Sequence, residues 1–146
     1  MNASATATAQ ALAEAASQAM WQRDLTAHAL GMELVSVAPG TAMLRMAVRA
    51  DMVNGHYTCH GGLIFTLADT AFAYACNSHN LNTVGSACHI DFVAPAQVGD
   101  MLEALAVERS ATGRTGVYDV TVGVAGGKTV ALFRGKSYRV KGEVTA

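Results

Sequence analysis

The chain has 146 residues, 51% of them hydrophobic, and a formal net charge of -1. This length suits one domain with a substantial core, and the apolar content excludes a disordered chain. The near-neutral charge gives no sign of a nucleic-acid or anionic-membrane partner.

The N-terminal part is small and polar over residues 1–9, and we expect a poorly ordered tail there, followed by a single domain over residues 10–146. Residues 10–30 are rich in Ala with apolar positions at helical spacing, which predicts one amphipathic helix ending at Gly31. The N-terminus lacks the basic segment and apolar core of a signal peptide.

The three cysteines, Cys59, Cys76 and Cys88, cannot all pair within one chain, and each lies in an apolar stretch. Reduced thiols are typical of cytoplasmic proteins, so we expect a cytoplasmic location.

The next elements are a predicted hairpin and a predicted buried helix. Short apolar runs at residues 32–37 and 41–48 flank a Pro39-Gly40 turn, which favours a hairpin. Residues 63–76 are apolar on nearly every face, and a helix of that kind must be covered on most sides. His60-Gly61-Gly62 is expected to join the preceding loop to this helix.

The C-terminal part alternates apolar and polar residues in four runs, at residues 87–95, 100–109, 115–124 and 128–140. Short Gly-rich connections between them predict an antiparallel meander. The fold class is therefore α+β: about six antiparallel strands curl as one sheet around the central helix, with an extra helix at the N-terminus.

Asp69 is the only Asp, Glu, Lys or Arg between Asp51 and Asp91, and it lies within the apolar helix. A buried carboxylate without partners costs several kcal/mol, or its pKa rises instead, which makes it a candidate catalytic base. The alternative is a structural role, in which Asp69 is hydrogen-bonded to Thr66, to Thr70 or to backbone at the sheet edge.

The start of the same helix offers the complementary group. A helix N-terminus has free N–H groups and a partial positive charge, and residues without Cβ, such as Gly61 and Gly62, let another molecule approach the backbone closely. An oxygen that gains negative charge could be stabilised there.

The spacing limits how these groups can cooperate. Asp69 lies seven residues after Gly62, on the same helix face but about 10 Å further along the axis. One small reacting group cannot touch both. A shared site therefore requires two antiparallel copies of the helix, as a two-fold dimer would supply.

The string NGHYTCHGGLIFTLADTAFAYACNSHN, residues 54–80, resembles the hotdog-fold acyl-CoA thioesterases of the phenylacetate-degradation (PaaI-type) branch. The later runs ACHIDFVAP, GRTGVYDVTV and KTVALFRGKSYRV resemble its strands in the same order. The resemblance implies a hotdog fold, a dimer that forms the active site, usually a tetramer, and hydrolysis of acyl-CoA without a metal or other cofactor.

The resemblance also implies roles for single residues. Asp69 matches the catalytic carboxylate and Gly61 the amide that polarises the thioester carbonyl. Asn54 matches the amide that helps to hold the water or the carbonyl, and His60 the histidine that orients the loop. The substrate is implied to be a phenylacetyl-type or similar aromatic acyl-CoA.

Further contacts with the substrate are expected at six positions. The acyl group and thioester are expected near the helix start and the third strand, at Gly62, Phe65 and Ser86. Basic residues of the GRTG and FRGKSYR segments are expected to meet the CoA phosphates, and these are Arg114, Arg134 and Lys136. Alternation places Arg134 and Lys136 on one face of their strand and Arg139 on the other.

Several other interpretations stay open. His56, Cys59 and His60 could bind zinc together with His79, Cys88 or His89, although no C-x-x-C pair is present. Cys59 could be a nucleophile activated by His60. The chain could also be a hotdog hydratase, a non-catalytic acyl-CoA-binding module, or a thioesterase for medium-chain aliphatic acyl-CoA.

Overall fold

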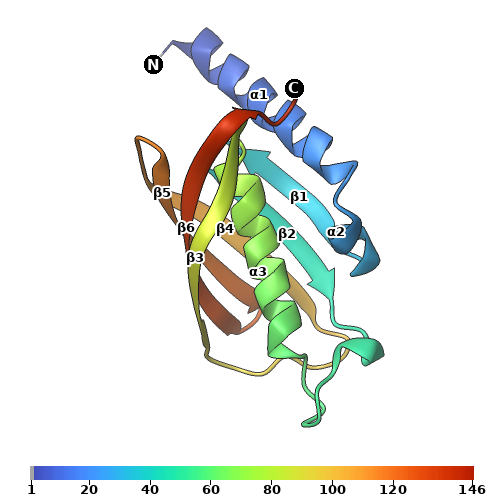
Figure 1. The fold of residues 1–146 in the computed structure, drawn as a ribbon. Coiled ribbons are helices and arrows are strands. Elements are labelled where there is room, and N and C mark those ends of the chain that lie inside the picture. The colour runs from blue at the N-terminus through green and yellow to red at the C-terminus, as the bar shows by residue number, and fades with distance from the viewer. Residues whose placement is uncertain (1) are drawn as a thin grey trace.

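A single antiparallel sheet curls around one long helix, α3, in the computed structural model, which describes residues 2–146 (Figure 1). The chain runs through α1 (Ala3–Trp21), α2 (Leu25–Ala29), β1 (Glu33–Ala38), β2 (Thr41–Ala47), the short 3-10 helix η1 (Ala50–Met52), α3 (Gly61–Cys76), β3 (Leu81–Phe92), β4 (Met101–Thr112), β5 (Thr115–Val124) and β6 (Thr129–Glu143). The expected architecture of six curved strands, a central helix and an extra N-terminal helix is confirmed.

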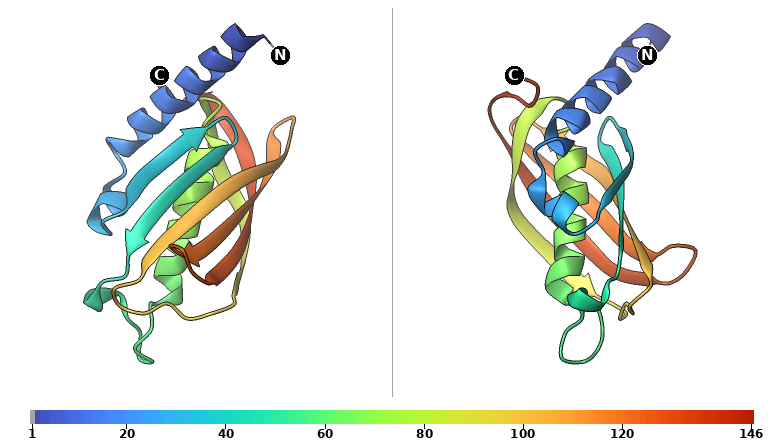
Figure 2. Two further views of the ribbon diagram at one scale, coloured as in Figure 1. Left: turned by 180° about the vertical axis from the view of Figure 1, so that it is seen from behind. Right: turned by 90° about the vertical axis from the view of Figure 1, so that its right-hand side faces the viewer.

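The N-terminal region differs from expectation in two ways. The helix α1 begins at Ala3, capped by the Asn2 side chain, so residues 3–9 are helical and not an irregular tail, while Met1 lies outside the described residues. The expected single helix over 10–30 is two helices, because Asp24 caps a new one through a hydrogen bond from the Ala27 amide at 3.1 Å. Figure 2 shows the start of α1 projecting beyond the sheet.

The strand order is β1-β2-β4-β5-β6-β3, and every pair is antiparallel. The hairpin β1–β2 and the meander β4–β5–β6 are as expected. Two expectations about β3 are wrong: it begins at Leu81, where no strand was expected, and it pairs with β6 and not with β4. The connection over residues 93–100 passes below the start of α3 to reach β4 (Figure 1).

The core lies between α3 and the concave face of the sheet. Apolar side chains of α3, such as Leu67, Ala71 and Phe72, pack on alternate residues of the strands. Gly135 lets the Phe72 ring approach β6, because a Cβ there would lie 2.8 Å from the ring. This close fit sets how deeply α3 sits in the sheet.

The two edge strands of the sheet, β1 and β3, have different surroundings. Gln10 of α1 donates a hydrogen bond to the Val37 carbonyl of β1 at 2.9 Å, so α1 lies along that edge. At the other edge, none of the 12 residues of β3 is buried, and β6 is its only strand neighbour in the described chain. A long exposed edge strand is prone to pair with another chain.

None of the helices described between Asn2 and Ala146 is both long enough and apolar enough to span a lipid bilayer.

Candidate active site

The first turn of α3 presents one backbone amide with no partner. His60 is the N-cap residue, and its Nδ1 accepts the Gly62 amide hydrogen bond at 2.9 Å. The His60 carbonyl accepts from the amides of Leu63 and Ile64. The Gly61 N–H makes no hydrogen bond within residues 2–146, so it is free to bind an oxygen at the positive end of the helix.

A cleft of about 340 Å³ opens at this amide. The loop before α3 and the end of β3 supply its walls, with Asn54, Thr58, Gly61, Phe92, Val93 and Pro95 among the lining residues. Gly61 and Asn54, which were expected to act together, therefore meet in one cavity.

Asn54 organises the loop that forms one wall of this cleft. Its Oδ1 accepts the backbone amides of His56, at 2.9 Å, and Thr58, at 3.3 Å, while its Nδ2 donates to the Thr58 hydroxyl at 3.1 Å. Since an amide nitrogen has two N–H groups, one donor of Asn54 remains for a ligand.

Phe92 was not identified from the sequence, although it lies directly beside Gly61. A Cβ built on Gly61 would be 3.2 Å from the Phe92 Cζ atom, while 53% of Phe92 is exposed. The ring is thus an apolar wall next to the free amide. The sequence places Phe92 in a predicted strand, but it does not show that this strand ends at the start of α3.

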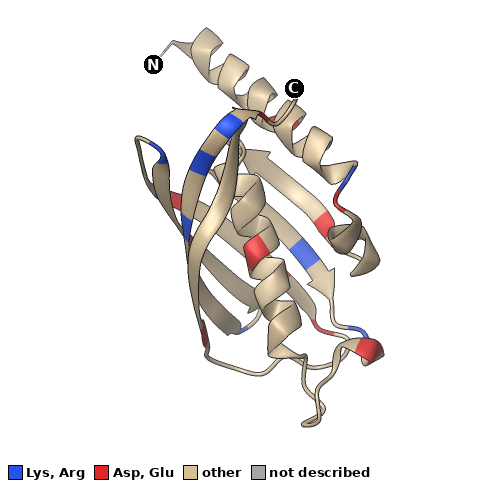
Figure 3. Cartoon of the chain, in the orientation of Figure 1, with Lys and Arg blue, Asp and Glu red and all other residues tan. Residues whose placement is uncertain are grey.

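Asp69 lies halfway along α3, partly buried and with no hydrogen-bond partner in the described chain. Thr66 and Thr70 do not serve it, because their hydroxyls donate to the Gly62 and Thr66 carbonyls. The structural alternative is therefore wrong for these two threonines. Asp69 is the only acidic or basic residue of α3, a helix on which Figure 3 shows acidic but no basic colour.

Burial raises the pKa of the Asp69 carboxyl above its usual value of 3.8. The Asp69 charge also adds to the effect of burial on the pKa of the Cys88 thiol in β3, which packs beside α3. A desolvated carboxylate without partners is a stronger base than an exposed one.

Gly61 and Asp69 cannot meet within one chain. They are eight residues apart on a helix, about 12 Å along its axis. The incompletely covered positions of α3 include Gly62, Thr66, Asp69 and Ala73, and we call these four the open stripe. A second copy of α3 lying antiparallel on this stripe would bring its Gly61 towards Asp69.

The comparisons with known proteins show the family of this chain. The family model described as "Thioesterase superfamily" matches residues 56–131. The chain is 53% identical over 127 residues to acyl-coenzyme A thioesterase PaaI of Escherichia coli K12, covering 87% of this chain and 91% of the relative. This chain belongs to the thioesterase superfamily.

Solved structures give the same result for the fold. The E. coli PaaI protein from the phenylacetic acid degradation operon superposes with a TM-score of 0.90 at 50% identity, covering 92% of this chain and 97% of that chain. A mutant of the phenylacetic acid degradation protein PaaI from Thermus thermophilus has a TM-score of 0.76 at 41% identity, covering 79% and 98%. The expected hotdog fold and thioesterase family are confirmed.

The expected CoA contacts are divided between the outer face of the thioesterase sheet and the β4–β5 turn. Arg134 lies on the outer face and donates to the Asp119 carboxylate through Nε and Nη2. Lys136 is exposed on the same face, whereas Arg114 lines a separate small pocket together with Arg139. The structure thus does not bring Arg114 together with Arg134 and Lys136.

The other three predicted substrate contacts lie on different elements. Phe65 of α3 is partly buried and packs edge to face on Phe133, with ring centroids 5.4 Å apart. Ser86 is exposed on β3, where its hydroxyl donates to the Lys136 carbonyl at 3.2 Å. Gly62 is exposed at the helix start, with its amide hydrogen-bonded to His60.

The alternative roles of the histidines and cysteines find little support. Among residues 2–146, no three His, Cys, Asp or Glu side chains are placed to hold a metal ion. Burial raises the pKa of the Cys59 thiol, the opposite of what a nucleophilic thiolate requires. The His60 Nδ1 accepts an amide hydrogen bond, so it is not available at that atom as a base for Cys59.

Proposed function

We propose that this protein is an acyl-CoA thioesterase that hydrolyses phenylacetyl-type aromatic thioesters to the free acid and CoA. The proposal is carried by two groups of α3 that have no hydrogen-bond partner within residues 2–146: the Gly61 amide, which lines a cleft, and the Asp69 carboxylate on the open stripe. The aromatic preference rests on the relatives named for PaaI and for phenylacetic acid degradation.

In the proposed reaction the thioester carbonyl oxygen accepts the Gly61 N–H hydrogen bond. The N-terminus of α3 then stabilises the negative charge that develops on that oxygen. The free N–H of Asn54 lies in the same cleft and can hold the attacking water or the carbonyl.

Asp69 of a second copy supplies the base. It takes one proton from a water molecule while the water oxygen bonds to the carbonyl carbon. The carbon–sulfur bond then breaks and the CoA sulfur leaves as the thiolate. Asp69 transfers the proton that it took from water to this thiolate. In the alternative mechanism the Asp69 carboxylate itself attacks the thioester carbonyl carbon and CoA leaves as the thiolate. Water then hydrolyses the resulting mixed anhydride. Neither route requires a cofactor, and CoA enters only as part of the substrate.

A homodimer is part of the proposal because the site is incomplete in one chain. The exposed β3 edge can extend the sheet into a second copy, and β3 packs beside α3, which carries the open stripe. Two such dimers would form the proposed tetramer.

A cytoplasmic location is proposed from the thiols. Cys59, Cys76 and Cys88 are all free, and two of them are buried. Free thiols are maintained in reducing compartments.

The alternatives predict different outcomes in one experiment. Purified protein is offered phenylacetyl-CoA, hydroxyphenylacetyl-CoA, hexanoyl-CoA and acetyl-CoA, and the released CoA is measured with a thiol-reactive dye. We expect the highest kcat/KM for the two aromatic thioesters. A higher value for hexanoyl-CoA would favour the medium-chain thioesterase, and binding without CoA release would favour the non-catalytic module.

A further inference from the structure

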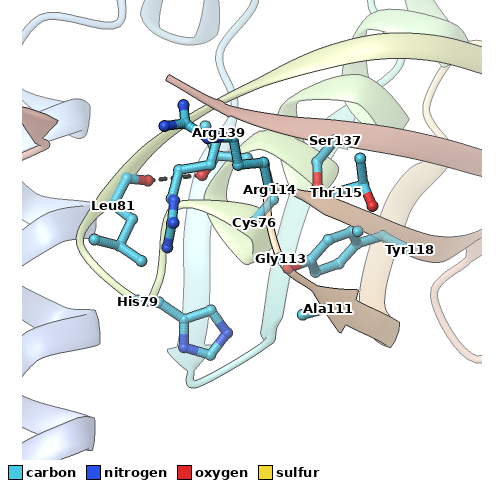
Figure 4. Close-up of a pocket in the computed structure, with 12 residues that line it drawn as sticks. Cys76, His79, Leu81, Ala111, Gly113, Arg114, Thr115, Tyr118, Ser137 and Arg139 are labelled. Atoms are coloured by element: carbon cyan, nitrogen blue, oxygen red, sulfur yellow. Dashed lines mark hydrogen bonds between the residues drawn. The ribbon is translucent and has the colours of Figure 1, made fainter. Parts of the chain in front are cut away.

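A second polar pocket lies near the C-terminal end of α3, away from the Gly61 cleft, and the reaction proposed above does not use it, although one of its lining residues, Arg114, was expected to meet the CoA phosphates. It has a volume of about 70 Å³ and lies between the β4–β5 turn, β6 and the start of β3 (Figure 4). That is several times the roughly 10–15 Å³ that one ordered water needs, and well below the roughly 300 Å³ of sites for drug-sized ligands. It has room for one small polar group.

Two arginines line this pocket, Arg114 in the β4–β5 turn and Arg139 in β6. The amide of Arg139 donates to the carbonyl of Arg114 at 2.7 Å, so β6 and the β4–β5 turn adjoin here, and both residues line the pocket. Figure 4 shows both side chains at the pocket. Neither guanidinium has a hydrogen-bond or ion-pair partner in the part of the chain that the structure describes.

Two neighbouring positive charges without a carboxylate repel each other, and a bound anion removes that cost. Glu108 contacts two residues of the pocket lining. Its carboxylate accepts a hydrogen bond from Tyr118 Oη at 3.1 Å and lies 2.7 Å from His79 Nε2. It therefore does not neutralise the arginines by direct contact.

Ser137 supplies a neutral donor in the same pocket. Only 4% of the residue is exposed, and its hydroxyl has no hydrogen-bond partner within residues 2–146. Gly116 keeps the space around this hydroxyl open, since a Cβ on it would stand 2.6 Å from Ser137 Oγ. The hydroxyl lines the pocket and can donate to the oxygen of a ligand there.

Two of the last carbonyls of α3 are paired, which reduces the negative partial charge of this helix end beside the pocket. The Ala73 carbonyl accepts from the Asn77 amide and Nδ2, and the Ala75 carbonyl accepts from the Ser78 amide and hydroxyl. Capping of this kind reduces the exposed partial charge of a helix end.

We propose that the pocket formed by Arg114, Arg139 and Ser137 binds a phosphoryl oxyanion. Arginine pairs and a hydroxyl match the tetrahedral oxygens of phosphate. The pocket begins at Cys76, about 10 Å along α3 from Asp69. The phosphoryl group can therefore come from the CoA part of the substrate, which deepens the proposed function, or from free phosphate or a small phosphorylated metabolite.

The test titrates inorganic phosphate into the full-length protein at constant ionic strength, with chloride as the blank, and follows backbone amide signals by ¹H–¹⁵N NMR. We expect saturable shifts at Gly116, Ser137 and Arg139. Arg139→Gln and Arg114→Gln should each weaken phosphate binding about tenfold or more, and Ser137→Ala should weaken it less. The matched control is Lys128→Gln, an equal loss of charge in the exposed β5–β6 turn, and it should leave binding unchanged.

The proposal is overturned if phosphate shifts these amides no more than chloride does, or if the arginine variants bind phosphate as Lys128→Gln does. Unchanged thermal unfolding of each variant shows that the fold is intact, and Ser137→Ala tests the pocket without changing charge.

The source of the phosphoryl group is decided by kinetics. If it belongs to CoA, KM for phenylacetyl-CoA rises about tenfold in Arg139→Gln and free phosphate competes with the substrate. If it is a separate ligand, KM is unchanged while phosphate binding is lost. The titration needs no turnover, so absence of thioesterase activity would refute the proposed function and leave this result standing.

Discussion

The Phe92 ring lies against Gly61, so that a methyl group added to the glycine would stand 3.2 Å from the ring. This contact is tighter than most side-chain packing allows. The glycine therefore keeps the cleft open at the residue whose amide is free.

The first prediction concerns this contact. Gly61→Ala should lower kcat/KM by about tenfold to a hundredfold, because displacement of the reacting group by even 1 Å costs that much. Phe92→Ala should restore part of the loss in the Gly61→Ala background, since it removes the clashing ring. Steady-state kinetics on both single variants and the double variant measures the coupling. If the loss of kcat/KM in the double variant equals the product of the two single losses, the contact between Phe92 and Gly61 is not the cause of the Gly61→Ala effect.

The second prediction concerns the base. Asp69→Asn should reduce kcat with phenylacetyl-CoA by about 10²–10⁴-fold, the range of general-base catalysis, while the protein remains folded and oligomeric. Glu33→Gln removes an exposed carboxylate of β1 and is the control. A normal rate for Asp69→Asn would rule out Asp69 as the base or nucleophile.

The third prediction concerns stability. Because burial raises the pKa of Asp69, the folded state holds that proton more tightly than the unfolded state. Stability is therefore lost as pH rises from about 3.8 through the folded-state pKa, and the cost is complete above both values. Asp69→Asn should unfold at higher urea than wild type at pH 7, and the gap should close below pH 3.8. An equal midpoint at pH 7 would contradict the desolvation of Asp69.

The fourth prediction tests whether two subunits share each site. Asp69→Asn and Gly61→Val should each be inactive alone. After subunit exchange in an equal mixture, about half of the dimers are mixed, and each of those has one intact site, so about a quarter of wild-type activity should return. Mass spectrometry of tagged chains verifies the exchange. If the subunits exchange and no activity returns, the Asp69 carboxylate and the Gly61 amide either act within the same chain or do not both belong to the active site.

The fifth prediction concerns the helix cap. His60→Ala removes the acceptor of the Gly62 amide and should lower the free energy of unfolding by about 1 kcal/mol. His60→Asn keeps a short acceptor at the N-cap and should lose less. Urea unfolding of the three proteins gives the comparison, and equal stability of His60→Ala and wild type would show that this hydrogen bond contributes nothing.

The sequence by itself predicts the elements whose causes are local. The apolar run of α3, the turn at Pro39-Gly40 and the alternation of β5 depend on periodicity and turn residues that neighbours in the chain supply. The same local logic marks Asp69 as anomalous, because one carboxylate stands out in an apolar helix. The segment over residues 54–80 also carries the family resemblance, which the comparisons confirm.

The tertiary structure decides which of these elements become neighbours. Alternation shows which residues share a strand face, but only long-range pairing places β3 beside β6, with its other edge free in the described chain. The end of β3 brings Phe92 to Gly61, while the β5–β6 register places Arg134 opposite Asp119 and leaves Arg114 in the β4–β5 turn. Contacts between distant segments depend on how the whole sheet closes around α3, and no local pattern in the sequence encodes that closure.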